Sequence, residues 1–158
     1  MDTLVELESE ESALKAADMG KVIVEVELVN TYDEEACRLG HLKAAQIRRT
    51  KVKMLVDTGS TATSIPEEEV KKLGLPLFKK VNSRYASGQV ATRNVYGPVK
   101  IQLMGRAMAV ATLIANPGTP SLLGQIPLEG LDLMVDSKHQ RLVPGHPDSP
   151  DEQVWEEY

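Results

Sequence analysis

The alternation of apolar and polar residues is the feature that most constrains the fold of this chain. The segment KVIVEVELV at residues 21–29 places Val22, Val24, Val26 and Leu28 at every second position. A repeat of two in β-branched residues is typical of a β-strand with one face in a core and the other toward water. Comparable runs occupy residues 47–57, 79–95, 97–105 and 106–115. We therefore expect a mostly-β fold.

One or two short helices are expected between the strands. The segment PEEEVKKLGL at residues 66–75 has Pro66 at the first helical position, glutamates in the first turn, lysines near the end and Gly74 as a stop. This arrangement is typical of a short helix, because the charges complement the helix dipole. Further helical turns are predicted at residues 33–39 and 126–131.

Glycines predict where the strand-like runs are interrupted. Gly88, the Gly97-Pro98 pair and Gly105 each separate two runs, and such residues punctuate strands because they permit turns. The segment MVDSKHQRLV at residues 134–143 resembles a hairpin, and its turn is predicted at residues 136–139.

The chain has the length of one domain. A sequence of 158 residues with 42% apolar and 26% charged residues is ordinary for a soluble globular protein with a single core. We expect the domain at residues 19–145. An acidic N-terminal extension at residues 1–18 and an acidic, proline-rich C-terminal tail at residues 146–158 flank it.

Charge and residue usage argue against several functions. A net charge of -5 disfavours nucleic acid as a partner. Cys37 stands alone, which excludes an internal disulfide and fits a reducing compartment. The acidic N-terminus is unlike a signal peptide, and no apolar run is long enough to span a membrane. We expect a cytoplasmic protein without a membrane partner. His41, His139 and His146 lie in separate segments, so no metal site is expected.

An acid at the end of an apolar run is the strongest candidate for chemistry. In MLVDTGSTATSIP, at residues 54–66, Asp57 follows three apolar residues and precedes a turn of small hydroxyl residues. A partly desolvated carboxylate costs stability unless it is hydrogen-bonded. Gly59 permits a tight turn with its amide near the acid, Thr58 offers a hydrogen bond across an interface, and Ser60 offers a proton to the carboxylate. Taken alone, the tetrapeptide favours an acid that a turn merely satisfies.

Two further motifs follow the first in a distinctive order. After LVDTGST at residues 55–61 come YASGQV at residues 85–90 and SLLG at residues 121–124. Over residues 19–145 the chain resembles the retropepsin-like (clan AA) aspartic peptidases, and it looks most like their bacterial stand-alone, single-domain members. The resemblance implies a single-domain closed β-barrel with one or two short helices.

The resemblance also implies a role for each motif. Asp57 is implied to be catalytic, in a loop supported by Thr58, Gly59 and Ser60. The implied flap, which covers a bound peptide, consists of Tyr85, Ala86, Ser87, Gly88 and Gln89. The implied brace beneath the catalytic loop consists of Leu122, Leu123 and Gly124.

The family's chemistry needs two carboxylates facing one water, one ionised and one protonated. This chain has one Asp-Thr-Gly. The resemblance therefore implies a symmetric homodimer in which each subunit contributes Asp57, acting as an aspartic endopeptidase on peptide or protein substrates without a cofactor.

The chain departs from the retroviral pattern at Thr61 and Gln125, where many retroviral members carry an Asp and an Arg that pair. Loss of both charges is compatible with the same fold, because neither partner is left buried and unpaired. Two alternatives remain open. The first is a catalytically silent dimer that binds peptides or acts in assembly, and the second is a monomeric β-barrel in which Asp57 is structural.

Overall fold

The computed structural model describes residues 22–84, 87–117 and 120–146. The strands are β1 (Val22–Asn30), β2 (Arg49–Val56), β3 (Ser64–Pro66), β4 (Leu77–Arg84), β5 (Val90–Leu103), β6 (Arg106–Asn116), β7 (Leu122–Leu123), β8 (Leu133–Asp136) and β9 (Arg141–Pro144). The helices are α2 (Thr31–Arg38), the 3-10 turn η1 (Ala44–Gln46), α3 (Glu67–Leu73) and α4 (Gln125–Gly130). The predicted mostly-β fold with short helices is confirmed. The N-terminal extension and all of the C-terminal tail except His146 lie outside the described residues.

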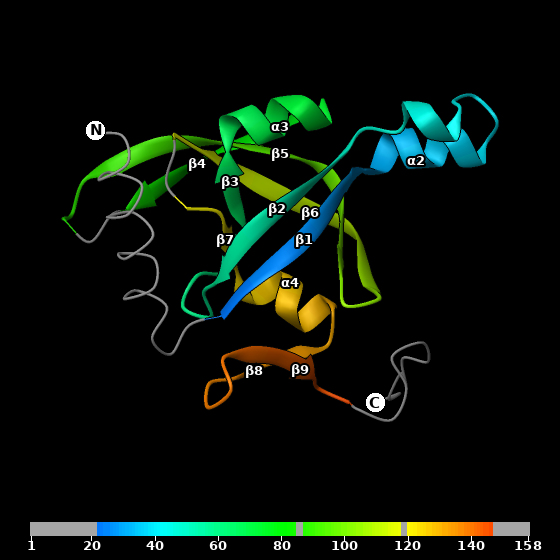
Figure 1. Cartoon of the computed structure of the whole chain (residues 1–158). Coiled ribbons are helices and arrows are strands. Elements are labelled where there is room, and N and C mark those ends of the chain that lie inside the picture. The colour runs from blue at the N-terminus through cyan, green and yellow to red at the C-terminus, as the bar shows by residue number, and fades with distance from the viewer. Residues whose placement is uncertain (1–21, 85–86, 118–119, 147–158) are drawn as a thin grey trace, which may run out of the picture.

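The main sheet is arranged as a ring of paired strands (Figure 1). Its strand order is β1-β2-β7-β3-β6-β5-β4, and β1 also pairs with β5. The pairings therefore return to β1, while β4 lies outside the ring on β5. The strands β8 and β9 form a separate hairpin below the ring.

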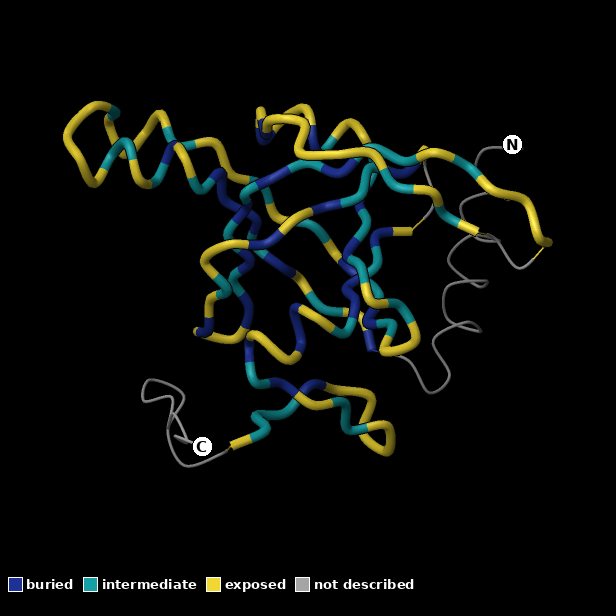
Figure 2. The backbone as a smooth tube through the Cα atoms, turned by 180° about the vertical axis from the view of Figure 1, so that it is seen from behind, coloured by how far each residue is buried: buried dark blue, intermediate teal, exposed yellow. Residues whose placement is uncertain are grey.

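The core lies inside this ring, and along much of β5 buried residues alternate with partly exposed ones (Figure 2). In the β1–β5 register Leu28 lies opposite Ile101, and both side chains are fully buried. Another fully buried side chain on β1 is Val26, and the other strands of the ring contribute Met54, Ile65, Leu113 and Leu123. Burial of one such side chain contributes about 1.5–3 kcal/mol, so the ring forms a rigid frame for the loops at its ends.

The helix α3 forms largely as the sequence predicts. Glu67 to Glu69 occupy its first turn, Val70 and Leu73 are buried, and Gly74 ends it at φ 59, a left-handed conformation that suits glycine. The expected place of Pro66 is wrong by one position. Pro66 is the last residue of β3 and the N-cap of α3 rather than its first helical residue.

The expected break at Gly97-Pro98 is also wrong. Strand β5 continues through both residues, and its ladder with β6 absorbs them in a register shift between Tyr96 and Val99. A side chain at Gly97 would place its Cβ 2.9 Å from the carbonyl oxygen of Ala111. The glycine therefore permits close strand approach instead of a turn.

Three smaller boundaries differ from the prediction by one or two residues. Helix α2 begins two residues before the predicted stretch, because the side chain of Asn30 accepts a hydrogen bond from the Asp33 amide (3.0 Å) and caps it. Helix α4 begins one residue earlier than expected, at Gln125. The β8–β9 turn comprises residues 137–140, one position later than predicted, and Gln140 adopts a positive φ of 50.

A buried arginine joins the lower hairpin to the ring. Nη1 of Arg106 donates to the carbonyl oxygens of Leu131 (2.9 Å) and Asp132 (2.8 Å), and it lies 3.3 Å from the Asp132 carboxylate. Hydrogen bonds from His146 and then from Arg106 hold the pKa of the Asp132 carboxyl below its usual range.

No helix within the described ranges is long and apolar enough to cross a membrane.

Candidate active site

Asp57 is the first residue after β2, and its backbone is tied to β7. Strands β2 and β7 are parallel, with Val56 opposite Leu123. The Leu55 amide donates to the backbone carbonyl of Ser121 (2.8 Å), and the Asp57 amide donates to the Leu123 carbonyl (3.0 Å). The acid thus stands at the end of a buried strand whose position is fixed by a second strand far away in sequence.

The turn that follows leaves one carboxylate oxygen open. The Gly59 amide donates to Oδ1 of Asp57 (3.0 Å), and the Ser60 amide donates to the Asp57 carbonyl (3.1 Å). A Cβ on Gly59 would lie 3.3 Å from Oδ1, so glycine allows this close amide contact. No other group in the described part of the chain hydrogen-bonds the carboxylate. Asp57 is partly exposed, so Oδ2 is available to a ligand.

The Ser60 hydroxyl does not donate to Asp57, contrary to the expectation from the sequence. Oγ of Ser60 donates to the carbonyl oxygen of Ala62 (3.0 Å). A hydroxyl can donate only one hydrogen bond, and here the Ala62 carbonyl oxygen accepts it. Ser60 therefore fixes the shape of the loop, and Thr58 lies exposed beside it.

The Leu-Leu-Gly segment packs directly under the loop. The Gln125 amide donates to the Ser60 carbonyl (2.7 Å), and the Gly124 amide lies 3.4 Å from Oγ1 of Thr63. A Cβ on Gly124 would lie 2.4 Å from the carbonyl oxygen of Ala62. Only glycine fits this contact without movement of the loop backbone.

Thr63 is a site residue that the sequence reasoning missed. Its side chain is buried, its carbonyl accepts from the Ile114 amide (2.8 Å), and its hydroxyl faces Gly124. The loop is thereby attached to β6 as well as β7. The only sequence signal was a threonine three positions before a proline, which is too common to single out.

The predicted flap segment connects β4 and β5. These strands pair antiparallel up to Arg84 opposite Val90, and Ser87, Gly88 and Gln89 lie between these two positions in the chain. Ser87, Gly88 and Gln89 are exposed, and Gly88 has a positive φ of 85. Tyr85 and Ala86 lie outside the described residues. The hairpin extends on the side of the molecule where β2 ends (Figure 1).

Thr61 and Gln125, the two neutral replacements, do not bond each other in the structure. The Gln125 side chain donates to Glu129 (3.2 Å), and Thr61 is exposed. Thr61 instead lines a hollow of about 300 Å³ beside the loop, together with residues of β6 and α4 that include Val110 and Ile126. The side chains of Val110 and Ile126 are exposed (65% and 55%) despite being apolar.

The histidines lie apart from this loop. His139 bonds Asp136 and His146 bonds Asp132, both on the lower hairpin side, and His41 is exposed after α2. No group of three or more potential metal-ligating side chains occurs within residues 22–84, 87–117 and 120–146.

Comparison with protein families identifies the same segments. A family described as "gag-polyprotein putative aspartyl protease" matches residues 44–129, which include the Asp57 loop, the β4–β5 hairpin and the Leu122–Gly124 segment. No curated protein gives a significant match to the sequence. Because the match covers more than half of the chain and includes its one Asp-Thr-Gly loop, this protein belongs to the retropepsin-like aspartyl protease family.

Proposed function

We propose that the chain is an aspartic endopeptidase that acts as a symmetric homodimer. The observation that carries this proposal is the geometry of Asp57. Its backbone is held by Leu123 and its Oδ1 by the Gly59 amide, while Oδ2 has no partner among the described residues. A carboxylate that is fixed but only half satisfied is suited to bind and activate a water. The described strands run from Val22 to Pro144, which supports a peptidase domain at residues 19–145.

The second carboxylate would come from Asp57 of the second subunit. The sequence contains no second Asp-Thr-Gly. Two carboxylates about 3 Å apart at an effective dielectric of about 20 would repel by about 5 kcal/mol if both were ionised. The pair therefore holds one shared proton near neutral pH, which supplies one base and one acid.

The reaction follows from this shared proton. The ionised Asp57 takes a proton from the water as the water oxygen bonds to the scissile carbonyl carbon, and the protonated Asp57 gives its proton to the carbonyl oxygen. The Asp57 that gave up its proton then takes one hydroxyl proton from the resulting diol, and the Asp57 that took a proton from the water gives that proton to the leaving nitrogen. The C–N bond breaks, leaving an acid and an amine, and the dyad regains its original protonation.

We further propose that the β4–β5 hairpin is the flap. Gly88 at its end adopts a left-handed conformation, and the neighbouring residues are exposed. A peptide in extended form would lie between this hairpin and the Asp57 loop and add to the sheet as a strand, with side-chain pockets setting specificity. The hollow beside Thr61 is one candidate for such a pocket, because exposed apolar side chains line it.

Substitution Asp57→Asn tests the proposal. The amide is nearly isosteric with the carboxylate but cannot serve as a base, so hydrolysis of a diverse peptide library should fall to background while folding and dimerisation persist. Asp136→Asn is the matched control, since Asp136 pairs with His139 and Arg141 on the separate β8–β9 hairpin. The control should cleave at the parent rate. Equal activity of parent and Asp57→Asn would leave the silent peptide-binding dimer as the better explanation.

A further inference from the structure

The charge of this chain is unevenly distributed along the sequence. The stretch from Val70 to Leu128 contains eight Lys and Arg residues and no Asp or Glu, although the whole chain has a net charge of -5. All the acids lie before or after this stretch. The basic stretch includes the proposed flap hairpin.

Three basic residues elsewhere in the stretch have acidic partners. Lys72 pairs with Glu69 (3.0 Å), Lys100 with Glu34 (2.5 Å) and Arg106 with Asp132 (3.3 Å). Each of these acids comes from outside the stretch. Pairing of this kind leaves little charge for a ligand.

The hairpin itself differs. Lys79, Lys80 and Arg84 on β4 are all exposed, and none has a carboxylate partner in the described part of the chain. Nζ of Lys79 instead lies 5.8 Å from the ring centroid of Phe78. We name these three residues the cationic strand.

The position of the cationic strand favours binding of an extended peptide. Strand β4 is the outermost strand, paired only with β5, so its other edge has unpaired backbone groups. Lys80 and Arg84 are an even number of residues apart, so their side chains share one face. Unneutralised cations beside an open strand edge create a positive potential where an extended chain can add. Lysines on an edge strand also discourage unwanted strand pairing, so the two roles need an experimental distinction.

Resting on the proposed function, we infer that the cationic strand selects peptides with acidic residues flanking the cleavage site. The partner is a peptide rather than a nucleic acid, because the cations lie on a hairpin that extends on the side where β2 ends (Figure 1) and the rest of the chain is strongly acidic. Side-chain carboxylates a few residues from the scissile bond would meet these cations while the peptide backbone lies near the Asp57 loop.

Three short peptides with one common apolar centre test this inference. Their flanks carry glutamate, glutamine or lysine. The full chain should cleave the glutamate peptide with kcat/KM about tenfold above the glutamine peptide, which corresponds to about 1.4 kcal/mol. The preference should shrink at about 1 M salt, where the Debye length falls to about 3 Å.

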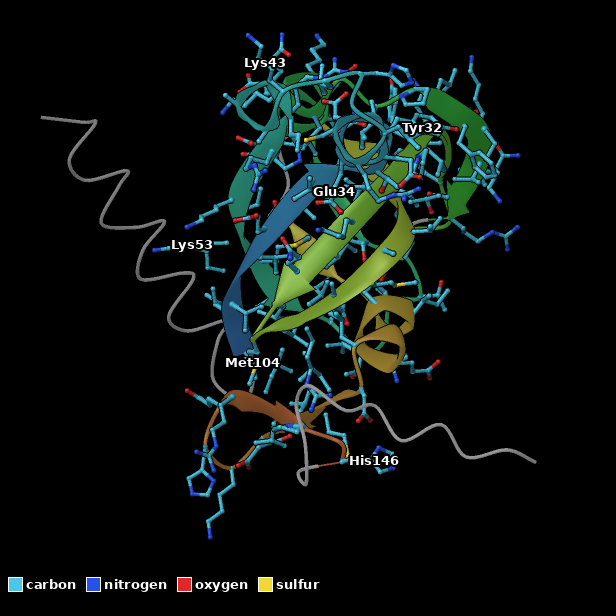
Figure 3. The ribbon with its side chains drawn as sticks, turned by 90° about the vertical axis from the view of Figure 1, so that its right-hand side faces the viewer. Tyr32, Glu34, Lys43, Lys53, Met104 and His146 are labelled. Carbon is cyan, nitrogen blue, oxygen red and sulfur yellow. The ribbon has the colours of Figure 1, made fainter. Side chains whose placement is uncertain are left out.

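The triple variant Lys79→Gln, Lys80→Gln, Arg84→Gln should bring the ratio of kcat/KM for the glutamate peptide to kcat/KM for the glutamine peptide close to one, and this ratio does not depend on the absolute rate. The matched control is Lys43→Gln, Lys53→Gln, Lys138→Gln, which removes the same charge from exposed sites. Figure 3 shows Lys43 and Lys53 pointing away from the molecule. The control should keep the preference. A double reversal, Lys80→Glu with Arg84→Glu, should shift the preference to the lysine peptide.

Direct binding separates this inference from the proposed function. The same peptides are titrated into the full-length Asp57→Asn chain and followed by fluorescence anisotropy, which needs no cleavage. If no peptide is cleaved by the parent but the glutamate peptide still binds through the cationic strand, the enzyme proposal fails and the selection of acidic peptides stands. Equal binding of the glutamate and glutamine peptides would overturn the inference.

Two other outcomes would also overturn it. A single-stranded oligonucleotide that displaces the glutamate peptide and binds more tightly would assign the cationic strand to nucleic acid. A triple variant that cleaves the glutamine peptide faster than the parent would indicate that the cationic strand holds an acidic segment of the chain itself.

Discussion

Gly124 and Ala62 meet so closely that a Cβ on Gly124 would lie 2.4 Å from the Ala62 carbonyl oxygen. That carbonyl also accepts the Ser60 hydroxyl. The contact therefore links the glycine of the Leu-Leu-Gly segment to the turn that carries Asp57. Backbone atoms have no room to yield there, so the position of the Asp57 loop depends on the absence of a side chain at residue 124.

Gly124→Ala should consequently lower both stability and activity. Over-packing against backbone costs about 1–3 kcal/mol, and any relief must move the Asp57 loop. Gly130→Ala is the control, because its Cβ would meet only the flexible end of Met108 (2.9 Å from Sδ), which can rotate away. Urea unfolding and peptide hydrolysis of both variants check this. A Gly124→Ala protein with parental activity per folded chain would contradict the bracing role.

Ser60→Ala should change stability rather than the pH dependence of hydrolysis. The hydroxyl bonds the Ala62 carbonyl, so its removal should cost about 1 kcal/mol of unfolding free energy. The two limbs of the profile of kcat/KM against pH should remain in place. If the alkaline limb moves to higher pH instead, the hydroxyl donates to the dyad in the active dimer, as the sequence alone suggested.

The strands were predictable because their pattern is local. The alternation in β1 and the charges and stop signal of α3 depend on neighbouring residues, and the structure has both elements. The turn after Asp57 was predictable for a different reason. The Asp-Thr-Gly turn makes its own short-range bonds, as the Gly59 contact with Oδ1 shows.

Features that depend on distant contacts were missed. Strand β3 is only Ser64–Pro66 and exists because β6 and β7 flank it. Gly97 was read as a turn, whereas it fits the close approach of Ala111 on another strand. The Ser60 hydroxyl could donate either to the Asp57 carboxylate or to the Ala62 carbonyl oxygen. Only the folded shape of the loop decides between these acceptors, and it favours Ala62.

Gly88→Val should reduce turnover far more than it reduces stability. Gly88 has φ 85 with open space around its Cβ, and Gly105, in the β5–β6 turn, has φ 72 with equally open space. The two substitutions should therefore cost similar folding energy, because both force a branched residue into the left-handed region. Only Gly88→Val should impair kcat/KM if the hairpin is a flap. Equal turnover in the two variants would remove the flap assignment.

Asp33 should stabilise the protein at neutral pH and lose this effect in acid. Nε and Nη2 of Arg48 donate to both Asp33 oxygens (2.8 and 3.0 Å), and the pKa of the Asp33 carboxyl is lowered chiefly by these bonds. A lowered folded-state pKa means that the contribution is complete above the unfolded value of about 3.9 and disappears as pH falls through the folded value.

Asp33→Asn should accordingly cost about 1 kcal/mol near neutrality, a figure reduced because Arg48 is half exposed. The difference from the parent should vanish in strong acid. Glu35→Gln breaks an exposed pair with Arg38 in the same helix and should have no measurable effect. Urea unfolding at several pH values provides the measurement. A cost for Asp33→Asn that persists in strong acid would point to packing rather than charge.

Mixing subunits should reveal whether two copies of Asp57 act together. If each active site needs one carboxylate from each chain, a heterodimer of parent and Asp57→Asn is inactive. After subunits exchange in an equal mixture, about a quarter of the dimers contain two parent chains, so the rate should fall to about a quarter of that of the same total amount of parent. An active monomer would retain half. Mixing with Asp136→Asn, whose change lies on the β8–β9 hairpin, should leave the rate unchanged.

Dilution is an independent test of the shared site. Below the dimer dissociation constant, activity per chain should fall in proportion to concentration. A rate of one half in the mixture, together with constant activity per chain on dilution, would contradict the shared site.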